Sequence, residues 1–161
     1  AYECNEKLRN TGNTLLSQTG IPVTIQTIGR DAAPPPAACD GAIIGIGAYT
    51  DMPGRNYRIE FLRGACRSLQ PGSPVLVSFL TRFGNPWKYR LVVLIGNCLR
   101  RLLFRDLLEM GDGLMFHYVH YFDEAQIADE FKAAGLTLKY FSIIGYGHAL
   151  GIVAAPGNSQ T

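Results

Sequence analysis

Residues 42–80 decide the fold, and they read AIIGIGAYTDMPGRNYRIEFLRGACRSLQPGSPVLVSFL. The segment 42–46 is an unbroken apolar run, which is typical of a buried strand in a parallel sheet. A second run of this kind, PVLVSFL, occupies residues 74–80. Between the two runs, apolar residues recur at helical spacing over 59–69, just before a Pro-Gly pair that ends the pattern. The segment is therefore predicted to form a strand, a helix and a strand.

The two apolar runs, 42–46 and 75–80, are predicted to pair in parallel within one sheet. A single helix joins them, and right-handed crossovers of this kind return the chain alongside the first strand. In open parallel sheets, ligands bind beyond the carboxyl ends of the strands. The residues that follow each strand are therefore the first candidates for a binding site.

The residues before this unit predict one more helix and one more strand. Residues 5–17 carry leucines at helical spacing and are followed by Gly20, a common helix stop. Residues 23–28 read VTIQTI, and this alternation predicts a strand. The stretch 32–38, AAPPPAA, follows it. Its prolines lack backbone donors and favour an extended surface loop.

A long amphipathic helix is predicted over residues 86–109, with Gly111 at its end. We interpret it as an insertion in the α/β unit. Its apolar side chains are expected to face the protein interior and its arginines to face solvent. The apolar positions are Leu91, Leu94, Ile95, Leu99, Leu102 and Leu103, and the basic ones are Arg90, Arg100, Arg101 and Arg105.

The C-terminal part is predicted as an extended segment, a helix and a hairpin. Residues 114–121 are rich in aromatic side chains and read as extended. Asp123 and Gln126 have the spacing of a capping box, which predicts that a helix begins there. The segments 136–144 and 149–154 have strand patterns and are joined through glycines. They are predicted to form an antiparallel hairpin near the edge of the sheet.

The composition is that of a single globular domain. The chain has 161 residues, of which 47% are hydrophobic and 17% charged, enough for one core. Its four cysteines form no CxxC pair and none has a neighbouring histidine, so structural zinc is not expected. The most apolar run, 91–95, is far too short for a membrane span, and no signal peptide is recognisable. We expect a soluble cytoplasmic protein with no membrane partner.

Charge is distributed unevenly along the chain. Residues 55–105 contain ten Lys or Arg and one acidic residue, whereas the rest contains five basic and twelve acidic residues. A basic block can attract nucleic acid or an acidic substrate. It can equally consist of arginine-rich helices with solvated faces. Under this second interpretation no nucleic-acid partner is expected.

Short motifs occur where the predicted strands and helices meet, in a defined order along the chain. The pair YE at 2–3 precedes the first helix, and DA at 31–32 follows the strand after it. The sequence DGAIIGIGAY spans 40–49, while YFDE at 121–124 and AAGL at 133–136 bracket the last helix. In this order and spacing, they resemble the later part of a class I S-adenosylmethionine-dependent methyltransferase.

The resemblance implies a three-layer, Rossmann-like α/β fold with a mostly parallel sheet and an antiparallel C-terminal hairpin. Residues 1–161 would form one partial methyltransferase-like domain, with the insertion at about 86–109. The implied cofactor is S-adenosylmethionine, and the implied activity is methyl transfer to an acceptor that the sequence does not identify.

The resemblance also implies roles for particular residues. A carboxylate at the position of Glu3 accepts hydrogen bonds from the ribose hydroxyls in this family, and the pair after the third strand contacts the adenine. The loop after the fourth strand passes beside the methionine end of the cofactor, where glycines let the backbone approach a ligand. The implied cofactor-binding residues are Glu3, Asp31, Ala32, Gly45, Ile46 and Gly47.

The resemblance begins at the family's second strand, and the sequence contains no GxGxG motif. In the family, that motif follows the first strand and presents backbone amides to the cofactor. We therefore expect this chain alone to bind the cofactor weakly or not at all, whereas an extended protein would bind it. A preceding segment of a longer protein, or a second copy in a homo-oligomer, is expected to take the place of the first strand. The alternative is a non-catalytic α/β interaction module that oligomerises through this edge.

Several other residues have two interpretations. Tyr49 and Tyr57 flank the implied acceptor site and could shape an aromatic pocket, or they could pack beneath the helix at 54–70. His117 and His120 could supply a general base, although side chains alternate along a strand and these two could point apart. We assign no catalytic residue. The acidic residues are scattered, with no HxxxH or DxD motif, so no metal site is expected.

Overall fold

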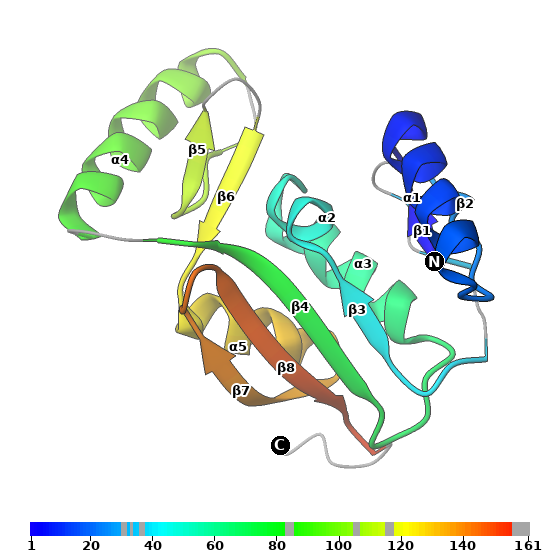
Figure 1. Ribbon diagram of the computed structural model, residues 1–161. Helices are drawn as coiled ribbons and strands as arrows, with labels where there is room; N and C mark the ends of the chain where they lie inside the picture. Colours follow the sequence, from blue (N-terminus) through cyan, green and yellow to red (C-terminus); the bar gives the residue numbers. More distant parts are fainter. Residues whose placement is uncertain are drawn as a thin grey trace.

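The predicted strand, helix and strand form the centre of the computed structural model (Figure 1). β3 (Ala42–Ile44) and β4 (Pro74–Thr81) pair in parallel, and α2 (Ile46–Thr50) and α3 (Arg55–Cys66) connect them. The predicted parallel pairing is therefore confirmed, although β3 ends at Ile44 instead of residue 46 and two helices instead of one connect the strands. The structure describes residues 1–29, 32, 34–35, 38–82, 86–104, 107–114 and 118–155.

Six strands form one mixed sheet, in the order β5-β6-β4-β8-β7, with β3 also paired to β4. β4 is parallel to β3 and β6 and antiparallel to β8, while β5 with β6 and β7 with β8 form antiparallel pairs. The predicted α/β fold class is confirmed, with β5 as a strand that the sequence did not predict. The further elements are α4 (Pro86–Leu102), β5 (Asp112–Leu114), β6 (Tyr118–Phe122), α5 (Glu124–Ala133), β7 (Leu136–Ser142) and β8 (Gly147–Val153).

The hydrophobic core of the described residues lies between one face of this sheet and helices α3 and α5. Side chains alternate along a strand, and Val75, Val77 and Phe79 of β4 are completely buried against apolar side chains of both helices. The intervening residues of β4 are half-buried, and Ile43 of β3 is 81% exposed. The main core is thus one-sided.

The N-terminal residues form a separate small unit. β1 (Tyr2–Glu3) and β2 (Gln26–Thr27) make a two-stranded parallel sheet, joined by α1 (Glu6–Thr19). The predicted strand over 23–28 was too long. The Asn13 side chain accepts from the Ile25 backbone N–H at 2.8 Å and donates to its carbonyl at 3.1 Å, so these backbone groups do not join a sheet.

Helix α4 differs from its prediction in length and in orientation. It ends at Leu102, and Gly111 precedes β5 instead of ending the helix. The Asn97 side chain accepts from the Leu108 backbone N–H at 2.6 Å and donates to the Leu108 carbonyl at 3.1 Å. The chain therefore folds back along the side of α4 that carries Asn97. The apolar side chains that were expected to face the interior are exposed. These are Leu91, Leu94, Ile95, Leu99, Leu102 and Leu103.

The predicted capping box and C-terminal hairpin are confirmed, with strands over 136–142 and 147–153 instead of 136–144 and 149–154. The Asp123 side chain accepts from the Gln126 backbone N–H at 2.9 Å, and the Gln126 side chain accepts in return from the Asp123 N–H, which forms the capping box. β7 and β8 form the predicted antiparallel hairpin, with Leu136 opposite Val153, and β7 lies at the sheet edge. None of the helices in the described part of the chain is long and apolar enough to cross a membrane.

Candidate functional site

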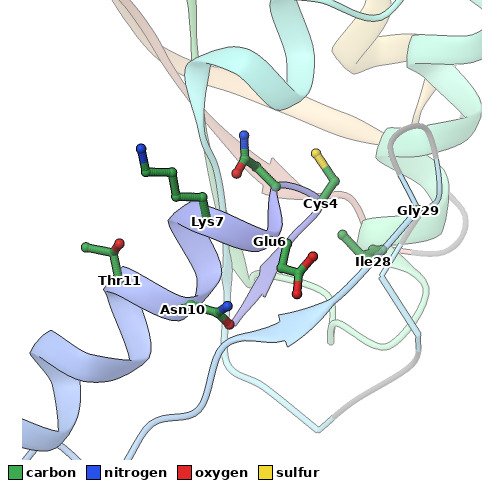
Figure 2. A pocket seen from close by; sticks show the side chains of 8 residues that line it. Cys4, Glu6, Lys7, Asn10, Thr11, Ile28 and Gly29 are labelled. Carbon is green, nitrogen blue, oxygen red and sulfur yellow. The ribbon is translucent and has the colours of Figure 1, made fainter.

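An open hollow of about 890 Å³ lies at the carboxyl ends of β1 and β2. Figure 2 shows the start of α1 on one side of it and the residues that follow β2 on the other. This is the end of parallel strands at which ligands bind in open α/β sheets. The hollow is lined by Cys4, Asn5, Glu6, Lys7, Asn10, Thr11, Ile28 and Gly29.

Glu3 is the last residue of β1 and directly precedes Cys4, which lines the hollow. Its Oε1 accepts a hydrogen bond from the Asn5 backbone N–H at 2.8 Å. Asn5 in turn is the N-cap of α1, because its Oδ1 accepts from the Leu8 N–H at 3.1 Å. The carboxylate therefore sits at the turn from strand to helix, and it is partly exposed.

The other side of the hollow leads to the predicted adenine contacts. Ile28 and Gly29 line it, and the Ala32 backbone N–H donates to the Gly29 carbonyl at 3.2 Å. Ala32 is thus hydrogen-bonded to a residue that lines the hollow. Asp31 lies outside the described residues, as does His117.

The segment Gly45, Ile46 and Gly47 lies at the carboxyl end of β3, where α2 begins. Gly45 is the N-cap residue of α2, and a methyl group added to it would meet open space. This space allows a ligand to approach the backbone there. The segment does not line the hollow beside α1, so the predicted cofactor residues that the structure describes are divided between the β1–β2 unit and the end of β3.

The two tyrosines predicted near an acceptor site have different environments. The Tyr49 side chain is completely buried, stacks on Phe122 at 5.0 Å between ring centroids, and donates its hydroxyl to Glu130. Burial and the neighbouring Glu130 carboxylate raise its pKa well above the usual value. Packing, the second interpretation, describes Tyr49 in this structure. Tyr57 is 66% exposed and remains accessible.

A buried arginine connects the helices on the core face. Arg58 of α3 is buried, and its Nη2 lies 2.6 Å from Glu130 Oε1 and 2.7 Å from Glu109 Oε2. Burial lowers the pKa of Arg58, but the hydrogen bonds and charge of Glu130 and Glu109 raise it by more, so the guanidinium stays charged. Arg58 is thus the centre of a buried ion-pair network.

The network continues into the β5–β6 hairpin through Asp112. The Asp112 carboxylate accepts from the Glu109 N–H at 2.7 Å and from the Tyr118 hydroxyl at 2.6 Å, and His120 Nδ1 lies 2.7 Å from it. Burial raises the pKa of Asp112, while the bonds from His120, Tyr118 and Glu109 lower it below its usual value overall. Burial and the Asp112 carboxylate raise the pKa of Tyr118.

The same residues bear on the predictions about histidines and metals. Donor atoms of Glu109, Asp112 and His120 lie within 4.8 Å of one another, so the fold gathers acidic residues that are scattered in the sequence. Their oxygens already bind Arg58, Tyr118 and backbone N–H groups, which explains the cluster without an ion. His120 is completely buried, so it packs in the core and has no access to a substrate.

Acidic residues of the same chain neutralise part of the basic block. Arg58 pairs with Glu130, Arg55 with Asp129 at 2.6 Å, and Arg82 with Asp123. The acidic partners all come from the C-terminal third of the sequence, where acidic residues are in excess. Part of the positive charge of residues 55–105 therefore serves the fold.

No protein-family model matches the sequence, and no curated protein sequence matches it. Solved structures do. A SAM-dependent methyltransferase from Methanosarcina mazei has a TM-score of 0.70 at 15% identity, over 95% of this chain and 80% of that one. One from Clostridium acetobutylicum has a TM-score of 0.66 at 9% identity, over 96% and 74%. The chain has the class I S-adenosylmethionine-dependent methyltransferase fold.

An O-methyltransferase from neocarzinostatin biosynthesis, in complex with S-adenosyl-L-homocysteine and 1,4-dihydroxy-2-naphthoic acid, has a TM-score of 0.59. It is 14% identical, and the match covers 96% of this chain but 41% of that one. The methyltransferase fold thus occurs within much longer chains.

Within this methyltransferase fold, the residues that line the hollow were missed at the sequence level. Cys4 and Asn5 follow β1, and Ile28 and Gly29 follow β2. Their position directly after a strand is the signal that could have identified them, since the strand ends were already singled out. The Arg58 network had no comparable signal, because its partners come from distant parts of the sequence.

Proposed function

We propose that this chain binds S-adenosylmethionine and transfers its methyl group to an acceptor. The observation that carries the proposal is the hollow at the carboxyl ends of β1 and β2, beside the acidic residue Glu3, in a chain with the methyltransferase fold. When bound, the cofactor supplies an electrophilic methyl group on a sulfonium.

The residues at the ends of β1, β2 and β3 offer groups that suit parts of such a cofactor. The partly exposed Glu3 carboxylate can accept hydrogen bonds from a ribose diol, and charge-assisted bonds of this kind are strong. Ile28 and Gly29 offer an apolar side chain and a bare backbone to a flat base. The open backbone at Gly45 leaves room for the methionine end. The contribution of these residues is to hold and orient the reactants, which is a large part of catalysis for a displacement.

Changing Glu3 to Gln is expected to weaken binding of S-adenosylhomocysteine about tenfold. Glutamine keeps an oxygen for the Asn5 N–H but removes the charge and one acceptor that the ribose would use. Affinity can be measured by calorimetry, or by ligand-observed NMR if binding is weak, as the absence of a GxGxG motif predicts.

Glu124→Gln is the matched control, because Glu124 is a solvent-accessible carboxylate at the start of a helix, α5, and does not line the hollow. This variant is expected to bind like the unchanged chain. Equal affinities for the Glu3 and Glu124 variants would remove Glu3 from the site. Complete absence of binding by the unchanged chain at millimolar ligand would contradict the proposed function of this chain.

The open edge of β3 favours a second candidate, an interaction module that assembles through this edge. Among the described strands, β3 pairs with β4 alone, so its other edge has no partner strand there. Its residues are Ala42, Ile43 and Ile44, without the charges or prolines that usually protect an edge. Pairing of this edge with another strand, from a second copy or from a preceding segment, would satisfy its backbone groups.

For this second candidate, the chain is expected to form a two-fold dimer, and Ile43→Lys is expected to convert it to a monomer. A lysine on an edge strand disfavours pairing with another edge. Ile144→Lys serves as control, because Ile144 is 84% exposed but lies outside the strands. Light scattering coupled to gel filtration measures the mass. A monomeric unchanged chain would exclude assembly of identical copies through β3.

A further inference from the structure

Helix α4 exposes the side that amphipathic helices normally bury. Asn97 binds Leu108 and Gly96 lies against the Leu108 side chain, so the small and polar positions of α4 contact the protein. The apolar positions form a broad arc on the remaining surface. The exposed members of this arc, here called the α4 apolar face, are Trp87, Leu91, Val92, Leu94, Ile95, Leu99 and Leu102.

The α4 apolar face is continuous with further apolar residues and lies at the periphery of the molecule. Leu103 follows it, and Phe104 is 98% exposed. Figure 1 shows α4 at one end of the structure, beside β5 and away from α1. Soluble monomers rarely expose an apolar patch of this extent, and such patches mark interaction sites.

The charge of α4 indicates which kind of surface it meets. Residues 86–104 contain four basic residues and no acidic residue. Arg90 and Arg101 are exposed and lie on one flank of the apolar face, next to Leu94 in the helical repeat. Helices with Trp and Leu on one side and Lys or Arg at the margins lie in the interface of anionic membranes.

A second copy of the chain fits this face less well. In an antiparallel pair of α4 helices centred near Ile95, Arg90 of each copy would lie opposite Arg101 of the other. The helix has no carboxylate to offset this repulsion, whereas an anionic lipid surface attracts the exposed Arg90 and Arg101.

We propose that α4 docks on anionic lipid membranes through its apolar face, with the arginines at the headgroups. The absence of a membrane-spanning run led us to expect no membrane partner, but a helix lying in the interface needs no such run. The proposal is independent of the methyl-transfer proposal, because it involves neither the hollow nor β3.

The experiment uses the whole chain with vesicles of phosphatidylcholine, with and without about one-third phosphatidylglycerol. The sequence has a single tryptophan, Trp87, and it lies on the α4 apolar face. We expect co-sedimentation with the anionic vesicles, a shift of the Trp87 emission to shorter wavelength, and a loss of both effects at high salt. Binding to neutral vesicles is expected to be much weaker.

Leu99→Asp is expected to weaken vesicle binding at least about tenfold, since one leucine leaves the acyl boundary and one negative charge enters. Arg101→Gln is expected to weaken it about fivefold. Leu15→Asp is the matched control, because Leu15 of α1 is 57% exposed, as Leu99 is. It should leave binding unchanged.

Failure of the unchanged chain to bind anionic vesicles would overturn the proposal, as would an equal loss for the Leu15 and Leu99 variants. A tryptophan shift that grows with protein concentration without lipid, and that Leu99→Asp abolishes, would assign the face to a second copy instead. Circular dichroism of the Leu99 variant checks that the exposed substitution leaves the fold intact.

Discussion

Replacing Arg58 with methionine is expected to lower the free energy of unfolding by about 3–5 kcal/mol. Methionine fills much of the same space but removes the cation between Glu130 and Glu109. In the unchanged chain, Arg58 Nη2 lies 2.6 Å from Glu130 Oε1 and 2.7 Å from Glu109 Oε2. Glu130 is as buried as Arg58. Without the guanidinium, the Tyr49 hydroxyl is the only described hydrogen-bond donor left to the Glu130 carboxylate. Denaturant unfolding followed by circular dichroism measures the loss.

The control for this prediction is Arg55→Met in the same helix. Arg55 pairs with Asp129, but both side chains are substantially exposed, so the expected loss is below about 1 kcal/mol. Combining Arg58→Met with Glu130→Gln should recover part of the lost stability, because the unpaired buried charge is then removed. Similar losses for the Arg55 and Arg58 variants would show that burial of the network contributes little.

The second large effect is expected at Gly111. Its φ of +113° is one that residues with a side chain rarely adopt, and a methyl group there would overlap the Tyr121 carbonyl oxygen. The Gly111 carbonyl also accepts from the Tyr121 N–H at 2.8 Å, so the two segments cannot separate without losing this bond. Gly111→Ala is expected to cost about 3–5 kcal/mol of stability, from backbone strain and overpacking together.

Gly72→Ala separates these two causes. Gly72 has a φ of +91°, but a methyl group added there would meet no atom within 4 Å. Its expected cost is that of the backbone conformation alone, about 1–2 kcal/mol. Thermal or denaturant unfolding of both variants gives the comparison. If Gly72→Ala destabilised the chain as much as Gly111→Ala, the contact with Tyr121 would have no energetic role.

The parts of the fold that were predictable from sequence depend on local rules. Asp123 and Gln126 form their capping box within one helical turn, and the two apolar runs needed one helix to define their parallel pairing. Glu3 and Gly45 were assigned through the resemblance to the methyltransferase family, not through a local pattern. Local sequence determines the capping box and the parallel pairing, because the interactions that make them lie within a few residues or one crossover.

The features that were wrong depend on contacts between distant residues. The shortened β2 follows from Asn13, which binds the Ile25 backbone from another element. The helical pattern identified the apolar side of α4 but not which side contacts the protein. The hydrogen bonds of Asn97 to Leu108 place the opposite side of the helix against the protein. The sequence left two interpretations open for Tyr49, because Glu130, the α5 residue that it contacts in the core, is 81 residues away in the chain.

The Arg58 network also sets the order in which the protein can be completed during synthesis. Arg58 leaves the ribosome before Glu109 and Glu130, which come 51 and 72 residues later in the chain. Until they arrive, packing α3 on the sheet would bury a cation without its partners, at a cost of the order of several kcal/mol. We therefore expect α3 to pack stably on the sheet only after α5 has left the ribosome.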